Sequence, residues 1–126
     1  MELRRIHASV VIDKLEEVER RFDRLTAEMS NPSVYADSAR YQKVARERSG
    51  IEKLVETYRV WKKVSTELKE YEEFLNGNDP DMRQMAKDEL PGVRTRRTQL
   101  EEELKLLLIP KAVSYTHLTM PTKRIV

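Results

Sequence analysis

SARYQKVARERSGIEKLVETYRVWKKVSTELKEYEEFLN, residues 38–76, is the stretch that decides the fold. Its apolar residues recur every three or four positions, so they share one face of a helix. Gly50 costs about 1 kcal/mol relative to alanine, but the pattern resumes after it, and one helix is expected through residue 76. Arg48 falls on the apolar face, and we expect that turn to face water. The apolar positions are Tyr41, Val44, Ile51, Leu54, Val55, Tyr58, Trp61, Val64, Leu68, Tyr71 and Leu75.

A shorter amphipathic helix precedes this stretch. It is expected to begin at Val10, with Ser9 as its N-cap, and to end at Met29. The run Ser30-Asn31-Pro32 ends it because proline disfavours helical geometry in the residue before it. Its apolar positions are Ile12, Leu15, Val18, Phe22, Leu25 and Met29.

The connections carry turn and cap residues. Residues 31–36 form a short connection, after which Asp37 or Ser38 can cap the long helix. Gly77 fits the position just after a helix, where a positive φ is expected. Asp79 is then expected to cap a third helix.

The third helix is expected to start at Pro80, which suits the first helical position, and to end at Pro110. Arg97 interrupts its apolar stripe. A proline inside a helix removes one backbone hydrogen bond and clashes with the preceding turn, so Pro91-Gly92 predicts a kink or a short break near residues 88–92. The apolar positions are Met82, Met85, Ala86, Leu90, Val93, Leu100, Leu104 and Leu107.

These patterns predict an all-α fold with three helices. Two of them form a long antiparallel helical hairpin, the N-terminal helix packs against it, and the packing is coiled-coil-like. The long helix alone would measure roughly 60 Å, more than a compact domain, so the hairpin should project. The helical domain is expected to cover residues 1–111. Residues 112–126, AVSYTHLTMPTKRIV, have no acidic residue and no helical period. They resemble a translated sequencing adaptor and are expected to be a non-native tail; a disordered native tail is the alternative.

Composition excludes several functional classes. The 126 residues include no cysteine, which excludes disulfides and thiolate metal sites. No run approaches the roughly 18 apolar residues of a membrane span. The formal charge of +2 depends on Lys123 and Arg124 in the tail, so residues 1–112 are neutral overall. That balance is weak support for nucleic-acid binding.

The sequence predicts no catalytic, cofactor-binding or metal-binding residue. His7 and His117 have no nucleophile or acidic cluster at useful spacing, and the three glycines are too far apart for a phosphate loop. The carboxylate groups Glu16-Glu17, Glu72-Glu73 and Glu101-Glu102-Glu103 are expected to be solvated, ion-paired helix faces. The aromatic residues Tyr41, Tyr58, Trp61 and Tyr71 are expected to pack and not to stack on bases. The basic clusters, each interleaved with acids, are Arg4-Arg5, Arg20-Arg21, Arg46 with Arg48, Lys62-Lys63 and Arg94-Arg96-Arg97.

Four strings resemble the bacterial-type peptide chain release factor 1 family, which belongs to the class I release factors. They are SVVIDKLE at residues 9–16, YQKVARERS at residues 41–49, DMRQMAKDEL at residues 81–90 and LLLIPK at residues 106–111. The resemblance covers about residues 8–111 in the family's order. Pro91-Gly92 departs from the family's third helix.

The resemblance implies a role in translation termination at UAA and UAG codons. It implies that this chain is the N-terminal ribosome-docking domain, which lies toward the large-subunit stalk base, and that it is monomeric and cytoplasmic. The family's Gly-Gly-Gln and Pro-x-Thr tripeptides are absent from the sequence. The chain is therefore expected to be truncated before the domains that read stop codons and trigger release, and not to be an enzyme.

Three alternatives remain open at this stage. A structural or adaptor coiled coil would share the heptad-like stripes but would form dimers or larger oligomers. Release factor 2 has a helical first domain but lacks the same Ile-Pro-Lys ending. A generic RNA-binding helical module would bind RNA in a salt-dependent way, which the neutral charge of residues 1–112 does not favour.

Overall fold

Four helices and no strand make up the part of the chain that the computed structural model describes, the backbone of residues 2–109 and the side chains of residues 10–109. In chain order they are α1 (Glu2–Met29), α2 (Pro32–Tyr35), α3 (Ser38–Leu75) and α4 (Pro80–Leu107). The predicted all-α fold is confirmed. The predicted tail at residues 112–126, Pro110 and His117 lie outside the described residues.

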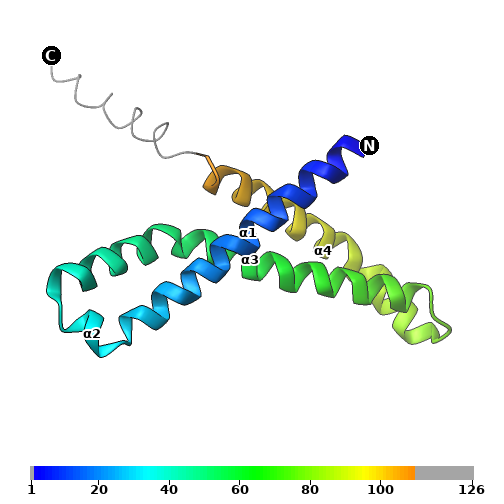
Figure 1. The fold of residues 1–126 in the computed structure, drawn as a ribbon. Coiled ribbons are helices and arrows are strands. Elements are labelled where there is room, and N and C mark those ends of the chain that lie inside the picture. Colours follow the sequence, from blue (N-terminus) through cyan, green and yellow to red (C-terminus); the bar gives the residue numbers. More distant parts are fainter. Residues whose placement is uncertain (1, 110–126) are drawn as a thin grey trace, which may run out of the picture.

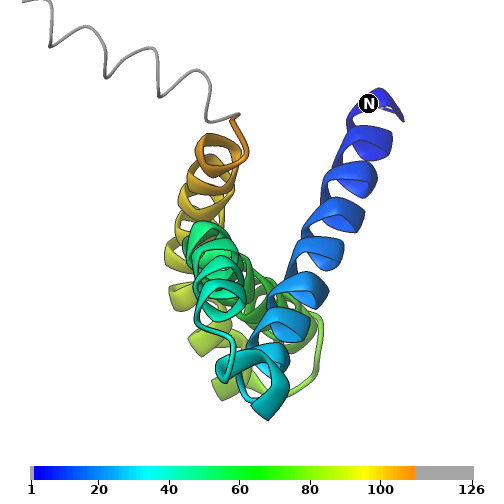
Figure 2. The same cartoon turned by 60° about the vertical axis from the view of Figure 1, so that its left-hand side comes forward.

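The long helix α3 is the centre of the molecule. α1 packs against its first half and α4 packs against its second half, each running antiparallel to it. Two helical hairpins therefore share one helix, and they point in opposite directions (Figure 1). Seen from the side, α1 diverges from α3 and α4 toward its N terminus (Figure 2).

Two apolar clusters hold these helices together. The first joins α1, α3 and α4 through Leu15, Tyr58 and Leu104, with Trp61 packed against it. The second lies at the end of the molecule that carries α2, where Leu25, Val34 and Val44 meet. Further along the α3–α4 hairpin, each helix contributes buried residues to the seam: Val64 and Leu68 on α3, and Ala86 and Leu90 on α4.

Most helix limits agree with the predictions. Asp37 caps α3 and accepts a hydrogen bond from the Arg40 backbone N–H. Asp79 caps α4, with Pro80 at its start. Residues 31–36 connect α1 and α3 as expected, but they include the single helical turn α2, whose Val34 is 1% exposed.

One predicted helix start and one predicted backbone conformation are wrong. Ser9 does not cap α1 because the helix already begins at Glu2; residues 2–8 contain neither proline nor glycine to interrupt it. Gly77 does not adopt a positive φ. The end of α3 closes instead through Asn76, whose backbone N–H donates to the carbonyls of Glu72 and Glu73, a tight turn that needs no left-handed residue.

The predicted break near residues 88–92 is also wrong, since α4 runs as one helix through Pro91; the kink stays a prediction. Leu90 and Ala86 are buried on α4, whereas Pro91 and Gly92 are exposed. Packing against α3 therefore offsets the backbone hydrogen bond that the proline removes.

Candidate functional site

Polar side chains gather where α1 lies on α3. Glu19 of α1 accepts from Arg59 Nε at 2.6 Å and from Lys62 Nζ at 2.8 Å, and its side chain is only 14% exposed. Glu16 accepts from Lys62 Nζ at 3.2 Å and from the hydroxyl of Tyr58. We call Glu16, Glu19, Tyr58, Arg59 and Lys62 the crossing cluster.

The crossing cluster shifts the pKa of each of its members. The hydrogen bond from Tyr58 is the main cause that lowers the pKa of Glu16, and the bond from Lys62 adds to it. Burial alone would raise the pKa of Glu19, but hydrogen bonds from Arg59 and Lys62 outweigh it and lower that pKa. Burial, followed by the bond to Glu16, raises the pKa of Tyr58.

The two cations of the crossing cluster shift in the matching direction. The hydrogen bond to Glu19 raises the pKa of both Arg59 and Lys62. A general acid or base needs a pKa near the operating pH, whereas here the carboxylates move further below neutrality and the cations further above it. The cluster is therefore suited to fixing α1 on α3, not to transferring protons.

We expect the crossing cluster to make stability depend on acid pH. A carboxylate whose pKa is lowered in the fold stabilises it above the unfolded pKa, and that contribution disappears as pH falls through the folded pKa. Glu16 and Glu19 both have a lowered pKa relative to 4.5. The urea concentration at the unfolding midpoint should therefore decrease as the pH is lowered from about 5 to about 2. The variant carrying Glu16→Gln and Glu19→Gln should lose less over that range; parallel pH profiles for the two proteins would rule the cluster out as the cause.

Two arginines that the sequence places on apolar stripes are partly exposed and also reach across to a neighbouring helix. The Arg48 guanidinium lies 4.4 Å from the centre of the Phe22 ring, and its Nε donates to the Thr26 hydroxyl at 2.7 Å. The expectation that this turn faces water is confirmed for Arg46, Glu47 and Ser49, which are exposed. Arg48 itself is partly buried because α1 supplies an aromatic face and an acceptor opposite the cation. Arg97 of α4 likewise reaches α3, where its Nε donates to Ser65 Oγ at 3.0 Å.

The aromatic residues pack inside the fold, as predicted. Tyr58 is 1% exposed and stacks on Trp61 with ring centroids 5.8 Å apart. The indole N–H of Trp61 donates to Glu101 at 3.1 Å, which ties α3 to α4. Tyr41 packs against the second apolar cluster, and Tyr71 is partly buried against Phe74. Sequence reasoning missed Tyr35, an exposed aromatic residue on α2.

Acidic residues on the other helices also form ion pairs between or within helices. Glu72 pairs with Arg94 at 3.7 Å, and Glu103 pairs with Lys53 at 3.8 Å. Glu102 pairs with Lys105 within α4. The predicted pairs three or four residues apart are confirmed within α4 for Glu102 and for Glu101, which pairs with Arg97 at 3.5 Å, whereas Glu72 and Glu103 pair with another helix.

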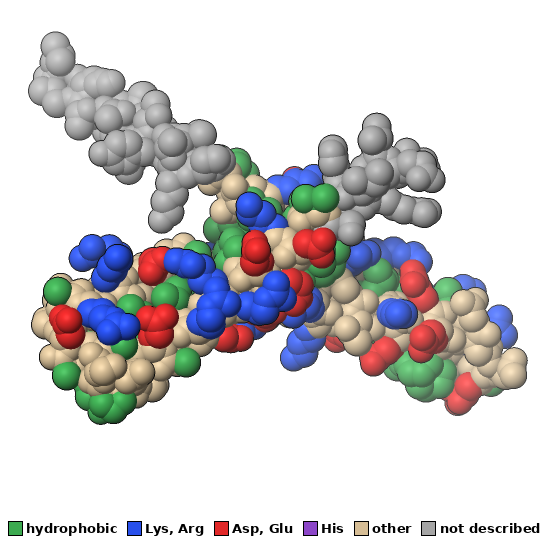
Figure 3. Space-filling view, in the orientation of Figure 1, with side chains coloured by type: hydrophobic (Ala, Val, Ile, Leu, Met, Phe, Trp, Pro, Cys, Tyr) green, Lys and Arg blue, Asp and Glu red, His purple; other side chains and the backbone are tan. Residues whose placement is uncertain are grey.

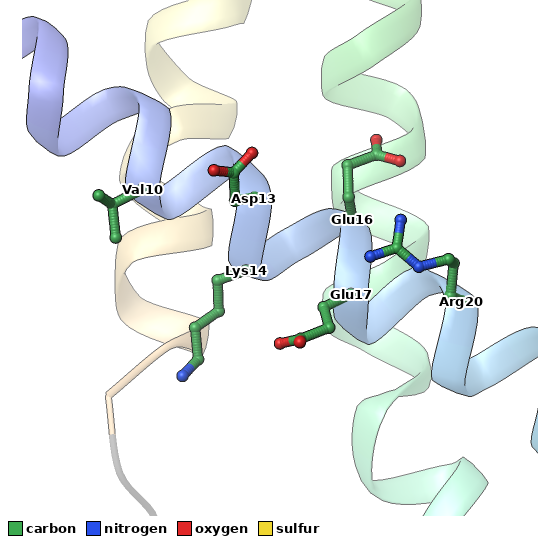
Figure 4. Close-up of a pocket in the computed structure, with 6 residues that line it drawn as sticks. All are labelled: Val10, Asp13, Lys14, Glu16, Glu17 and Arg20. Carbon is green, nitrogen blue, oxygen red and sulfur yellow. The ribbon is translucent and has the colours of Figure 1, made fainter.

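A shallow hollow lies on α1 alone (Figure 4). Its lining residues include acidic and basic side chains of one helix, and Arg20 extends back toward Glu16 and Glu17. A hollow lined by a single helix cannot enclose a small molecule in the way a binding cleft does. Its lining residues are Val10, Asp13, Lys14, Glu16, Glu17 and Arg20.

Other kinds of site are missing from the described part of the chain. Residues 10–109 hold no group of three or more His, Asp or Glu side chains placed to bind a metal ion. None of the described helices has a stretch long and apolar enough to cross a bilayer. His7 and Arg4-Arg5 lie on α1, but their side chains are not among those described.

Comparison with known proteins gives consistent matches. The sequence pattern of the PCRF domain matches residues 18–117. The peptide chain release factor 1 of Myxococcus xanthus (strain DK1622) is 55% identical over 101 residues, which cover 80% of this chain and 28% of the relative. That of Anaeromyxobacter sp. (strain Fw109-5) is 45% identical over 101 residues, 80% of this chain and 27% of the relative. That of Listeria monocytogenes serovar 1/2a is 44% identical over 100 residues, 79% of this chain and 28% of the relative.

The chain thus spans about 28% of the length of the relatives it matches. No solved structure matches the fold at a significant level.

Proposed function

The chain belongs to the PCRF-domain family, and on that premise we propose that it is the N-terminal ribosome-docking domain of a release factor 1 and serves translation termination. The observation that carries this proposal is a family match from residue 18 through the whole α3–α4 hairpin. The relatives named above are each called release factor 1, which favours that family over release factor 2. The family match also argues against an unrelated adaptor coiled coil.

The architecture suits a domain that positions the longer protein to which it belongs. α3 has 38 residues, about 57 Å at 1.5 Å per residue, and helices pack along both of its halves. The lowered carboxylate pKa values in the crossing cluster do not suit proton transfer. We therefore propose no catalytic role for the crossing cluster. Recognition of UAA and UAG and the release of the peptide would belong to other domains of the longer protein, acting on a ribosome in the cytoplasm.

A domain exchange tests this proposal. Residues 18–109 of this chain would replace the matching segment of the Myxococcus xanthus release factor 1. We expect the chimera to release peptide at UAA and UAG codons on purified ribosomes. A matched chimera that carries an unrelated antiparallel helical hairpin should need a higher concentration to reach half its maximal rate, since a docking domain contributes binding and not chemistry.

The chain on its own supplies the second arm of the test. It contains no Gly-Gly-Gln, so we expect no stop-codon-dependent release from the purified chain, and light scattering should find a monomer. A folded but inactive first chimera, equal performance of the unrelated hairpin, or release by the chain alone would each refute the docking role.

A further inference from the structure

Charge is divided unequally between the two ends of the molecule, although residues 1–112 are neutral overall. We define the basic end as residues 20–48, which comprise the last turns of α1, α2 and the first turns of α3. It holds seven Lys or Arg and four Asp or Glu. The acidic end, residues 69–89 at the tip of the α3–α4 hairpin, holds three Lys or Arg and seven Asp or Glu.

The acids of the basic end are mostly engaged. Glu47 pairs with Arg21, and Asp23 pairs with Arg59 at 2.9 Å. Asp37 caps α3 through the backbone N–H of Arg40. Few carboxylates are therefore left to neutralise the other cations nearby.

Five cations of the basic end are exposed, and within residues 10–109 none of them forms an ion pair. On α3 they recur three residues apart, so they follow one side of the helix. Figure 3 shows Lys and Arg side chains spread over this end, with fewer Asp and Glu between them. The five are Arg20, Arg24, Arg40, Lys43 and Arg46.

We propose that the basic end docks on the phosphate backbone of RNA. Arginine dominates the set, and its planar fork matches phosphate oxygens better than an ammonium does. Tyr35 adds an aromatic ring that is 57% exposed on α2, between the two cationic helices, where it can stack on an unpaired base. The inference rests on the proposed function for the identity of the RNA, which would be ribosomal.

The test compares two charge reversals of equal size in the full chain. One variant carries Lys43→Glu and Arg46→Glu at the basic end, and the control carries Arg83→Glu and Lys87→Glu at the acidic end. Both pairs are exposed on helix surfaces, and both variants keep Lys123 and Arg124. The ends are separated by most of α3, far beyond the screening length of about 10 Å in 0.1 M salt.

Binding would be followed by the fluorescence anisotropy of a labelled RNA stem–loop over a range of salt concentrations. At about 0.1 M salt we expect the basic-end variant to bind at least about tenfold more weakly. Its salt slope should be smaller by about two, because two side chains no longer neutralise a phosphate. The control should bind nearly as the parent chain does. Circular dichroism should give the same helix content for all three proteins.

Three results would overturn the proposal: no RNA binding by the parent chain at low salt, equal weakening in both variants, or tighter binding of a polyglutamate peptide than of the RNA. The chimera assay and the RNA titration can fail separately. If the chimera is active but the basic end binds no RNA, this inference is refuted and the proposed function stands. If the basic end binds RNA but the chimera is inactive, the proposed function is refuted and RNA binding stands.

Discussion

Replacing Tyr58 by alanine should lower the free energy of unfolding by about 3–5 kcal/mol, the range for removing a buried aromatic side chain. Tyr58 is 1% exposed and contributes to the apolar cluster that joins α1, α3 and α4. Its ring also stacks on Trp61, and its hydroxyl donates to Glu16. A domain with a total stability of about 5–15 kcal/mol would lose a large part of it. Urea unfolding followed by circular dichroism measures the change.

Two matched variants separate the contributions of Tyr58. Tyr58→Phe keeps the packing and removes the hydroxyl, so it should cost only about 1 kcal/mol. Tyr35→Ala removes the same side chain at an exposed position on α2 and should change stability by less than about 0.5 kcal/mol. If Tyr58→Ala cost no more than Tyr35→Ala, the three long helices would not depend on this shared cluster.

The local signals in the sequence predict most of the secondary structure. The apolar stripe of residues 38–76 predicts α3 to within one residue of its end at Leu75, because the period resumes in phase after Arg48 and Gly50. Asp79 and Pro80 predict the start of α4, because cap chemistry is local. Gly77 shows the limit of such signals, since a glycine permits a left-handed turn without requiring one.

The partners of the charged residues could not be predicted in the same way. Arg48 and Arg97 stand in the sequence as interruptions of an apolar stripe, yet each meets an aromatic ring across a helix pair. Glu19 looks like any surface glutamate, but it is placed between two cations of α3. Which side chains face each other depends on the rotation of two helices about their axes, and the period of either helix alone does not contain that information.

The two exposed ends of the molecule show the same limit for function. The net charge of residues 1–112 is zero, although the basic end carries +3 and the acidic end carries −4. A count along the sequence already separates these two segments, but only the fold shows that the cations of α1 and those of α3 share one end of the molecule, opposite the α3–α4 tip that carries the acids (Figure 1, Figure 3). A neutral helical domain can therefore present a locally basic surface, and electrostatic steering depends on that local surface.

Pro91→Ala should raise the free energy of unfolding by about 2 kcal/mol. Alanine restores a backbone N–H that can donate to the carbonyl of Lys87 and removes the ring clash, together about 3 kcal/mol. The unfolded chain gains freedom when proline is replaced, which offsets up to about 1 kcal/mol of that gain. Pro91 is exposed within a continuous α4, so the change should leave the packing of Leu90 unaltered.

Gly92→Ala is the matched control for Pro91→Ala, because a Cβ atom at Gly92 would meet no atom within 4 Å. It should stabilise the fold by about 1 kcal/mol through helix propensity alone. Thermal unfolding of the two single variants and the double variant separates the two effects. If Pro91→Ala destabilised the protein while Gly92→Ala stabilised it, the fold would require the proline's own geometry at this turn. Pro91 would then stabilise the fold by setting the backbone geometry of α4 at this turn, and packing against α3 would not be needed to offset the missing hydrogen bond.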